Sequence, residues 1–235
     1  MELIIVKSKD EMGSMAGKIF AEAISAKPDI VLGLATGSTP LPLYQELIRM
    51  CKNGTLDFSD VTSVNLDEYV GLSGAHDQSY RYFMNINLFD HINIDKAKTH
   101  VPRGDAGDPE DECARYDELI DNLGGIDLQL LGVGLNGHVG FNEPADAFST
   151  QTHVVELAES TIQANSRFFE NPSDVPRKAI TMDIRHIMLA KKVILIAGPE
   201  KKELVEKAVY GDVTPQVPAS VLQLHRNVTV ILSES

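Results

Sequence analysis

The stretch of sequence that decides the fold is LLGVGLNGHVGFNEP, which occupies residues 130–144. It begins as an apolar strand and continues into a loop with four glycines, whose backbone can take positive φ and approach a ligand closely. The same loop carries Asn136, His138, Asn142 and Glu143 within eight positions. Ligands of open α/β sheets bind beyond the carboxyl ends of the strands. The stretch therefore predicts a strand of such a sheet, followed directly by a ligand site.

Two side chains of this loop, His138 and Glu143, can meet because they are five positions apart on a flexible backbone. A carboxylate beside an imidazole orients the ring and tunes its basicity, which favours acid–base chemistry near neutral pH. The alternative is a plain β–α turn with an exposed His and a capping Asn. The glycine spacing also resembles a dinucleotide fingerprint, but Phe141, Asn142 and Pro144 interrupt the helix that should follow, so no nicotinamide site is expected.

Apolar runs that predict buried strands alternate with helical patterns along the whole chain. The expected strands are 3–6, 30–35, 61–66, 99–101, 127–133, 154–157, 179–182, 193–197 and 228–232. The expected helices are 9–25, 40–50, 79–89, 109–123, 160–169, 183–189 and 200–209. This alternation predicts an α/β fold, a doubly wound, mostly parallel open sheet with helices on both faces, Rossmann-like in type. No linker or repeat interrupts it, so residues 1–235 are expected to form a single domain.

The composition is that of an ordinary globular protein, with 43% hydrophobic and 23% charged residues. No apolar run approaches the roughly 18 residues that a membrane span needs. The first seven residues, MELIIVK, are too short and too quickly charged for a signal peptide. Cys51 and Cys113 form neither a metal-ligand pattern nor a disulfide framework. A cytoplasmic protein is expected.

The net charge of −13 argues against nucleic acid or an anionic membrane as a partner. It does not exclude a small anionic substrate. Because salt screens charges beyond about 8 Å, a few local cations and N–H groups can control a pocket.

A second candidate site is the turn Thr36-Gly37-Ser38-Thr39, which joins the strand at 30–35 to a helix that opens with Pro40. Such a junction offers free backbone N–H groups, the positive end of the helix dipole and three hydroxyls. This combination predicts a phosphate site. The alternative is a helix cap without a ligand, and the missing Gly-Lys-Ser/Thr ending rules out a Walker loop.

Three charged residues lie at predicted element ends. Asp67 follows the strand at 61–66, where a carboxylate can act as a general base or can cap the next turn, and the residues alone leave both open. Arg167 and Lys201 are cations near element ends, and each by itself is better explained as a solvated surface charge.

Five stretches, taken together, resemble the glucosamine-6-phosphate deaminase family. The matching stretches are ATGSTP at 35–40, NLDEYVGL at 65–72, GVGLNGHVGFNEP at 132–144, ANSRFF at 164–169 and SVLQLH at 220–225. Any one of them would be weak support. Their order along essentially the whole chain makes the resemblance specific.

The resemblance implies conversion of glucosamine 6-phosphate and water to fructose 6-phosphate and ammonia, without a metal or an organic cofactor. It identifies His138 as the acid–base group that opens the sugar ring, with Glu143 orienting it. It identifies Asp67 as the base that moves a proton from C2 to C1. The phosphate would be held by the loop at 36–39, Arg167 and Lys201.

Asn136 departs from some family members, which carry Asp at this place of the ring-opening cluster. Because an amide cannot accept a proton or add charge to His138, Asn136 is expected to orient its neighbours by hydrogen bonding only, and Glu143 to carry more of that task. The reaction should survive with a shifted pH profile.

Two other functions share the resembled architecture: 6-phosphogluconolactonase-like or pentose-phosphate isomerase enzymes, and non-catalytic sugar-phosphate sensor domains. The Asp67-Glu68-Tyr69 triplet together with the His138 loop favours the deaminase, and no basic helix-turn-helix segment accompanies the chain. A monomer or small homo-oligomer without an allosteric activator is expected. The stretch QTHVVE at 151–156 has no Lys or Arg to hold an activator phosphate, and the sequence ends soon after its last strand.

Overall fold

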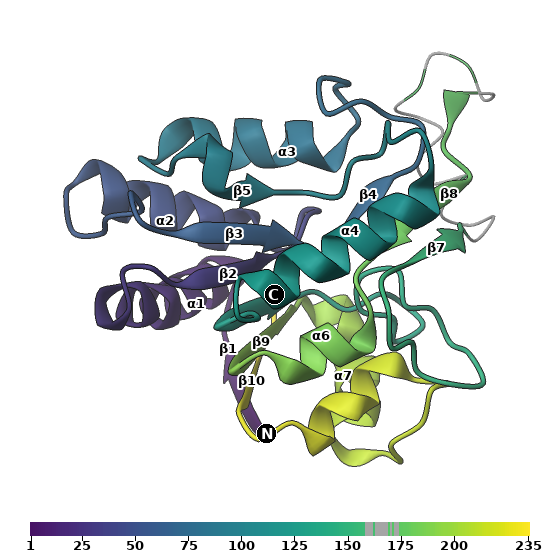
Figure 1. The fold of residues 1–235 in the computed structure, drawn as a ribbon. Coiled ribbons are helices and arrows are strands. Elements are labelled where there is room, and N and C mark those ends of the chain that lie inside the picture. Colours follow the sequence, from purple (N-terminus) through teal and green to yellow (C-terminus); the bar gives the residue numbers. More distant parts are fainter. Residues whose placement is uncertain (158–161, 163–168, 170, 172–173) are drawn as a thin grey trace.

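The computed structural model describes residues 1–157, 162, 169, 171 and 174–235, and its central feature is a seven-stranded sheet (Figure 1). In spatial order the strands are β1 (Glu2–Val6), β10 (Val228–Ser233), β9 (Lys192–Ala197), β6 (Leu128–Leu131), β2 (Val31–Leu34), β3 (Thr62–Asn65) and β5 (Thr99–His100). All neighbouring pairs of this sheet are parallel. The predicted fold class is confirmed. The expected helix at 160–169 falls on a segment outside the described residues, apart from 162 and 169.

Helices connect these strands. They are α1 (Lys9–Ala26), α2 (Leu41–Lys52), α3 (Tyr80–Asn87), α4 (Pro109–Asn122), α6 (Ile184–Leu189) and α7 (Lys202–Tyr210), with 3₁₀ turns at Phe89–His91, Lys96–Lys98, Pro199–Lys201 and Pro218–Leu224. Helices α4 and α6 lie side by side on one face of the sheet (Figure 1). Helices α1 and α2 pack against each other, so closely that a Cβ at Gly13 would meet Pro42 at 2.6 Å. No helix in the described ranges is both long and apolar enough to cross a membrane.

A second, smaller sheet corrects two of the sequence expectations. Strands β4 (Asp67–Tyr69), β8 (Lys178–Thr181) and β7 (His153–Glu156) form a three-stranded antiparallel sheet beside the main one (Figure 1). The runs at 154–157 and 179–182 were expected to belong to the parallel sheet. Strand β7 is only partly buried, unlike the fully buried β2 and β6, so its pairing follows from tertiary contacts rather than from a continuous apolar run.

The order of the central strands positions the candidate site. Strands β9, β6, β2 and β3 are consecutive neighbours and run in parallel, so the segments that follow them leave the sheet at the same edge. The buried side chains that support these strands form one hydrophobic cluster, in which Phe20, Tyr44, Leu47 and Tyr116 are fully enclosed. The loops at this edge are therefore held on a rigid base.

Candidate active site

A cavity of about 200 Å³ opens at the carboxyl edge of the main sheet. Its lining residues are Ala35, Thr36, Gly37, Thr39, Leu66, Asp67, Tyr80, Gly132, Val133, Gly134, His138, Gly140 and Phe141. The cavity thus brings together three segments that the sequence singled out separately: the 36–39 turn, the end of β3 and the glycine-rich loop.

The turn after β2 leads directly into α2. Gly37 has a φ of 95°, a conformation that L residues with a side chain rarely adopt. Pro40 occupies the N-cap of α2, and no side chain of the described residues caps this helix. In its first turn Pro42 has no N–H and that of Leu41 donates to the carbonyl oxygen of Ser38 at 3.4 Å, so the backbone donors on this side come mainly from the turn itself. Thr36 and Thr39 face the cavity, whereas Ser38 is exposed and borders a neighbouring hollow together with Leu41. This wall of the cavity is rich in donors and suits an anion.

Asp67 is the first residue of β4, immediately beyond the end of β3, and only 7% of it is exposed. Among the described residues, no group donates a hydrogen bond to its carboxylate. The carboxylate faces the glycine-rich loop, since a Cβ at Gly140 would lie 3.7 Å from Oδ2. Burial, helped by the neighbouring Glu68, raises the pKa of Asp67 to about 8. A buried, uncommitted carboxylate with a raised pKa is a suitable general base.

Glu68 is adjacent to Asp67 in the sequence, but its carboxylate has a structural role. Its carboxylate accepts the backbone N–H groups of Tyr69 at 2.8 Å and of Tyr80 and Arg81, both at 2.9 Å. These bonds join the first turn of α3 to β4. They place the ring of Tyr80 in the cavity wall beside Asp67.

Three side chains of the glycine-rich loop form one cluster. Nδ1 of His138 lies 3.1 Å from Oε1 of Glu143, which is within ion-pair distance. The two groups are not aligned as a hydrogen bond, and Nδ1 has no other hydrogen-bond partner among the described residues. The amide of Asn136 donates to the other oxygen of Glu143. The backbone N–H of His138 donates to Oδ1 of Asn136 at 3.3 Å. The interaction with His138 is the main cause that holds the pKa of Glu143 below its usual range. Such contacts often become better aligned only when substrate binds.

The backbone of Gly134 fits closely against the His138 ring. A Cβ at Gly134 would lie only 2.1 Å from both Cε1 and Nε2 of that ring. The N–H of Gly134 also donates to the carbonyl oxygen of His138 at 2.9 Å. Glycine at this position is therefore needed for the observed placement of the imidazole.

Tyr80 is a site residue that the sequence reading missed. Its hydroxyl donates to that of Tyr69 at 3.1 Å, and its ring stacks at 9° against Phe141, with 6.2 Å between centroids. Burial holds the pKa of Tyr80 well above its ordinary value, so the phenol stays neutral. The sequence marks Tyr80 only as a residue near a helix start. Its place at the cavity follows from the Glu68 bonds, which no local pattern reveals.

Of the two cations that were expected to bind the phosphate, only Lys201 belongs to the described residues. Lys201 ends the 3₁₀ turn that follows β9, one strand from β6, and does not line the cavity in the part of the chain that is described. Desolvation lowers its pKa. Arg167 lies outside the described residues. The roles of both remain predictions.

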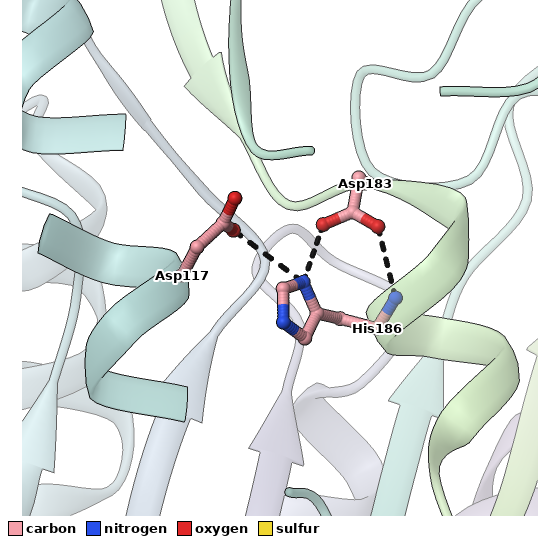
Figure 2. A group of neighbouring side chains, drawn as sticks. All are labelled: Asp117, Asp183 and His186. Carbon is pink, nitrogen blue, oxygen red and sulfur yellow. Dashed lines mark hydrogen bonds and ion pairs between the residues drawn. The ribbon is translucent and has the colours of Figure 1, made fainter. Parts of the chain in front are cut away.

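A second group of polar side chains lies between α4 and α6 (Figure 2). Asp117 of α4, the α6 cap Asp183 and His186 of α6 place ligand-type atoms within 4.8 Å of one another. Their arrangement suits a shared proton better than a metal ion. Asp183 and Asp117 already accept backbone N–H groups, and the guanidinium of Arg185 lies 3.0 Å from the His186 ring.

The chain has relatives among known proteins that cover its full length. Residues 8–231 match the family described as glucosamine-6-phosphate isomerases/6-phosphogluconolactonase. A Clostridium perfringens glucosamine-6-phosphate deaminase is 59% identical over 100% of this chain and 97% of its own length. The structure of a monomeric glucosamine-6-phosphate deaminase is 46% identical, with a TM-score of 0.94 over 99% of this chain and 97% of that one. The 6-phosphogluconolactonase of Thermotoga maritima, 18% identical with a TM-score of 0.77 over 99% and 98%, shares the fold.

Proposed function

The chain belongs to the glucosamine-6-phosphate isomerase/6-phosphogluconolactonase family, and we propose that it converts glucosamine 6-phosphate and water to fructose 6-phosphate and ammonia. The observation that carries this conclusion is the identity of 59% with a deaminase over the entire chain. The cavity supports it, because a carboxylate, Asp67, and an imidazole, His138, line the same small space beside a wall of N–H and hydroxyl donors.

The first chemical step is opening of the pyranose ring, which we assign to His138. One group must accept the proton of the C1 hydroxyl and donate a proton to the ring oxygen, and an imidazole does both near neutral pH. Glu143 holds the imidazole ring of His138 in place through the contact at 3.1 Å. Asn136 orients Glu143 through its amide donor and accepts the backbone N–H of His138 on Oδ1, so its assistance is limited to hydrogen bonds.

The second step is proton transfer between neighbouring carbons, which we assign to Asp67. Its carboxylate takes the C2 proton of the open-chain aldehyde. The electron pair of the C–H bond forms the C1=C2 bond of an enolamine, and the C1=O pair moves to O1, which takes a proton from water. Return of the proton to C1 gives an imine at C2, and water hydrolyses this imine to the ketone and ammonia. A single carboxylate on one side of the enolamine plane suits both transfers.

The phosphate is assigned to the 36–39 loop, supported by Arg167 and Lys201. The backbone of the loop supplies N–H donors, and the start of α2 supplies the positive end of the helix dipole. Thr36 and Thr39 supply hydroxyls on the cavity side, and Ser38 adds a donor at the rim. With these local donors, an anionic substrate is compatible with a net charge of −13.

A coupled assay tests the proposed activity. Purified protein is given glucosamine 6-phosphate, and ammonia is measured with glutamate dehydrogenase. Steady release of ammonia is expected, whereas a 6-phosphogluconolactonase would instead hydrolyse 6-phosphogluconolactone, and a sensor domain would bind sugar phosphates without turnover. The low identity of 18% to the lactonase makes that second function the less supported one.

We further propose that residues 1–235 act as one catalytic domain, as a monomer, in the degradation of amino sugars in the cytoplasm. The monomer is supported by the 46% identical structure, which is described as monomeric. The location is supported by Cys51 and Cys113, both of which are free thiols.

The kinetics should be hyperbolic and insensitive to N-acetylglucosamine 6-phosphate. An activator phosphate needs charge-assisted donors, but residues 151–156 contain no Lys or Arg, and the His153 ring already contacts the carbonyl oxygen of Gln151. Lys178, which pairs with this stretch across the small sheet, is engaged by Glu156 at 3.3 Å. Initial rates are compared with and without the acetylated sugar phosphate. A sigmoidal curve that becomes hyperbolic on its addition would show that an activator site exists.

Substituting Gly134 by Ala should lower kcat by about 10²-fold, because the new methyl group displaces the His138 ring from its place. Gly107→Ala is the matched control, since a Cβ there meets nothing within 4 Å and the backbone is not left-handed. Both variants are assayed for ammonia release, and their thermal unfolding is followed by circular dichroism. Normal activity of Gly134→Ala would mean that the ring can move without loss and that its observed position is not required.

A further inference from the structure

Asn142, which precedes Glu143, is 6% exposed and closes the loop that follows the His138 cluster. Its amide nitrogen donates to the carbonyl oxygens of Val139 at 3.0 Å and Met182 at 2.8 Å. Its oxygen accepts the hydroxyl of Ser149 at 2.6 Å. Donors and acceptor are thus all engaged inside the protein, so the side chain is committed to holding backbone rather than to binding a ligand.

Residues 149–152, called the strap below, are in turn fastened to α6. The N–H of Ile184, the first residue of α6, donates to the Ser149 hydroxyl at 3.2 Å. The Arg185 side chain donates to the carbonyl oxygen of Thr150 at 3.1 Å. Ser149 therefore links the Asn142 carboxamide to the start of a helix, and the loop between residues 142 and 149 is closed at its base.

The far end of the strap is fastened to α4. The N–H of Thr152 lies 3.2 and 3.1 Å from the two carboxylate oxygens of Asp117. The same carboxylate lies 3.4 Å from Nδ1 of His186, which also contacts Asp183 (Figure 2). Burial alone lowers the pKa of His186, but the hydrogen bond with Asp183 and the charge of Asp117 raise it overall. The imidazole of His186 thus ties α4, α6 and the strap together.

We propose that Asn142 is a positioning residue for the His138–Glu143 pair, and that the strap, anchored on the His186 cluster, holds Asn142 in place. Hydrogen bonds and ion pairs connect His186 to Asp117, Asp117 to the strap, and the strap to Asn142, which precedes Glu143. Asn142 does not line the cavity that contains Asp67 and His138, although it borders a neighbouring one together with Glu143 and Ser149. Its effect on the candidate site must therefore act through the orientation of Glu143. The proposal rests on the proposed function, in which that pair opens the sugar ring.

Ser149→Ala is the mildest test, because it removes the hydroxyl that joins Asn142 to α6. We expect kcat on glucosamine 6-phosphate to fall about tenfold. The 4,5-dideoxy analogue of the substrate has no hydroxyl with which to close a furanose or a pyranose ring and stays open-chain, so its turnover should fall less than about twofold. Ser149→Thr keeps the hydroxyl and should restore the rate. Ser59→Ala is the control, because Ser59 is exposed and lies in the turn before β3, at the amino edge of the sheet.

Two further variants test the neighbouring links. Asn142→Asp replaces donors by a carboxylate that faces two carbonyl oxygens, and should give a larger loss with the same preference for the open-chain analogue. His186→Asn keeps a donor near the position of Nδ1 but removes the rest of the ring, and should give a smaller loss than Asn142→Asp. Equal losses on the pyranose and open-chain substrates, or full activity of Ser149→Ala, would overturn the proposal.

A direct readout separates this proposal from the proposed function. The imidazole signals of His138 are followed by NMR in wild type, Ser149→Ala and Ser59→Ala at one pH. We expect a changed chemical shift or line width in Ser149→Ala alone. Unchanged signals would contradict the positioning role even if deamination is observed. Changed signals in a protein that releases no ammonia would support the positioning role and reject the deaminase.

Discussion

Replacement of Asp67 by Asn should abolish deamination, with kcat lowered roughly 10²–10⁴-fold. The amide has nearly the same shape but cannot take the C2 proton. Because the carboxylate accepts no hydrogen bond from the described residues, its loss should leave the fold and the binding of inorganic phosphate almost unchanged. Asp60→Asn, which removes an exposed carboxylate at the amino edge of the sheet, is the matched control and should keep wild-type activity. Exchange of the C2 proton with solvent at the wild-type rate in Asp67→Asn would remove this residue from the role.

The raised pKa of Asp67 adds two pH-dependent results. As a base it must be ionised, so kcat/KM of the free enzyme should rise with pH through about 8. Between the ordinary pKa of 3.8 and the folded pKa of about 8, Asp67 is protonated in the folded protein but ionised in the unfolded chain. The contribution of Asp67 to the free energy of unfolding therefore falls as pH rises between those two values. The melting temperature of Asp67→Asn, relative to wild type, should therefore increase from about pH 4 to about pH 8. A difference that does not change with pH would contradict the raised pKa.

Replacement of His138 by Gln should slow the pyranose substrate by roughly 10²–10⁴-fold and the 4,5-dideoxy open-chain analogue far less. The ring-opening step needs a group that both accepts and donates a proton, and an amide does neither at neutral pH. The carbon chemistry at Asp67 should continue once the chain is open. The measurement is kcat on both substrates.

His91→Gln is the control for His138→Gln, since His91 lies in the 3₁₀ turn Phe89–His91, outside the cavity lining. It should retain normal rates on both substrates. If His138→Gln loses equal activity on the pyranose and on the open-chain analogue, His138 acts in a later step or in binding, and its assignment to ring opening is wrong.

Much of the main sheet could be predicted because its strands are short apolar runs bounded by glycine, proline or charged residues. Strands β2, β6 and β9 are almost completely buried, so their sequences have few polar interruptions. Once these strands are parallel neighbours, the turn at 36–39, Asp67 and the glycine-rich loop must share an edge. The convergence of these segments was therefore within reach of sequence reasoning.

The small antiparallel sheet could not be predicted in the same way. Strand β4 has three residues, and its Asp67 pairs with Thr181, more than a hundred positions away. Strand β7 is only partly buried, so its alternation of side chains gives a weak signal. Pairings of this kind depend on tertiary contacts that a local pattern does not contain.

Polar contacts between segments that are distant in the sequence could not be predicted either. Tyr80 reaches the cavity because Glu68 accepts the N–H groups of the first α3 turn. The bond between Asn142 and Ser149 closes a loop whose base is set by α6. Each of these side chains is compatible with many local roles, and only the packing of helices against the sheet selects one of them.

The most direct test of the central claim is to follow glucosamine 6-phosphate and the purified protein by proton NMR in D₂O. We predict that the amino-sugar signals disappear while fructose 6-phosphate and ammonia form in equal amounts, with deuterium at C1 of the product from exchange at the Asp67 carboxyl group. Asp67→Asn should leave the substrate spectrum unchanged. An unchanged spectrum with wild-type protein that hydrolyses 6-phosphogluconolactone in a parallel sample would contradict the deaminase.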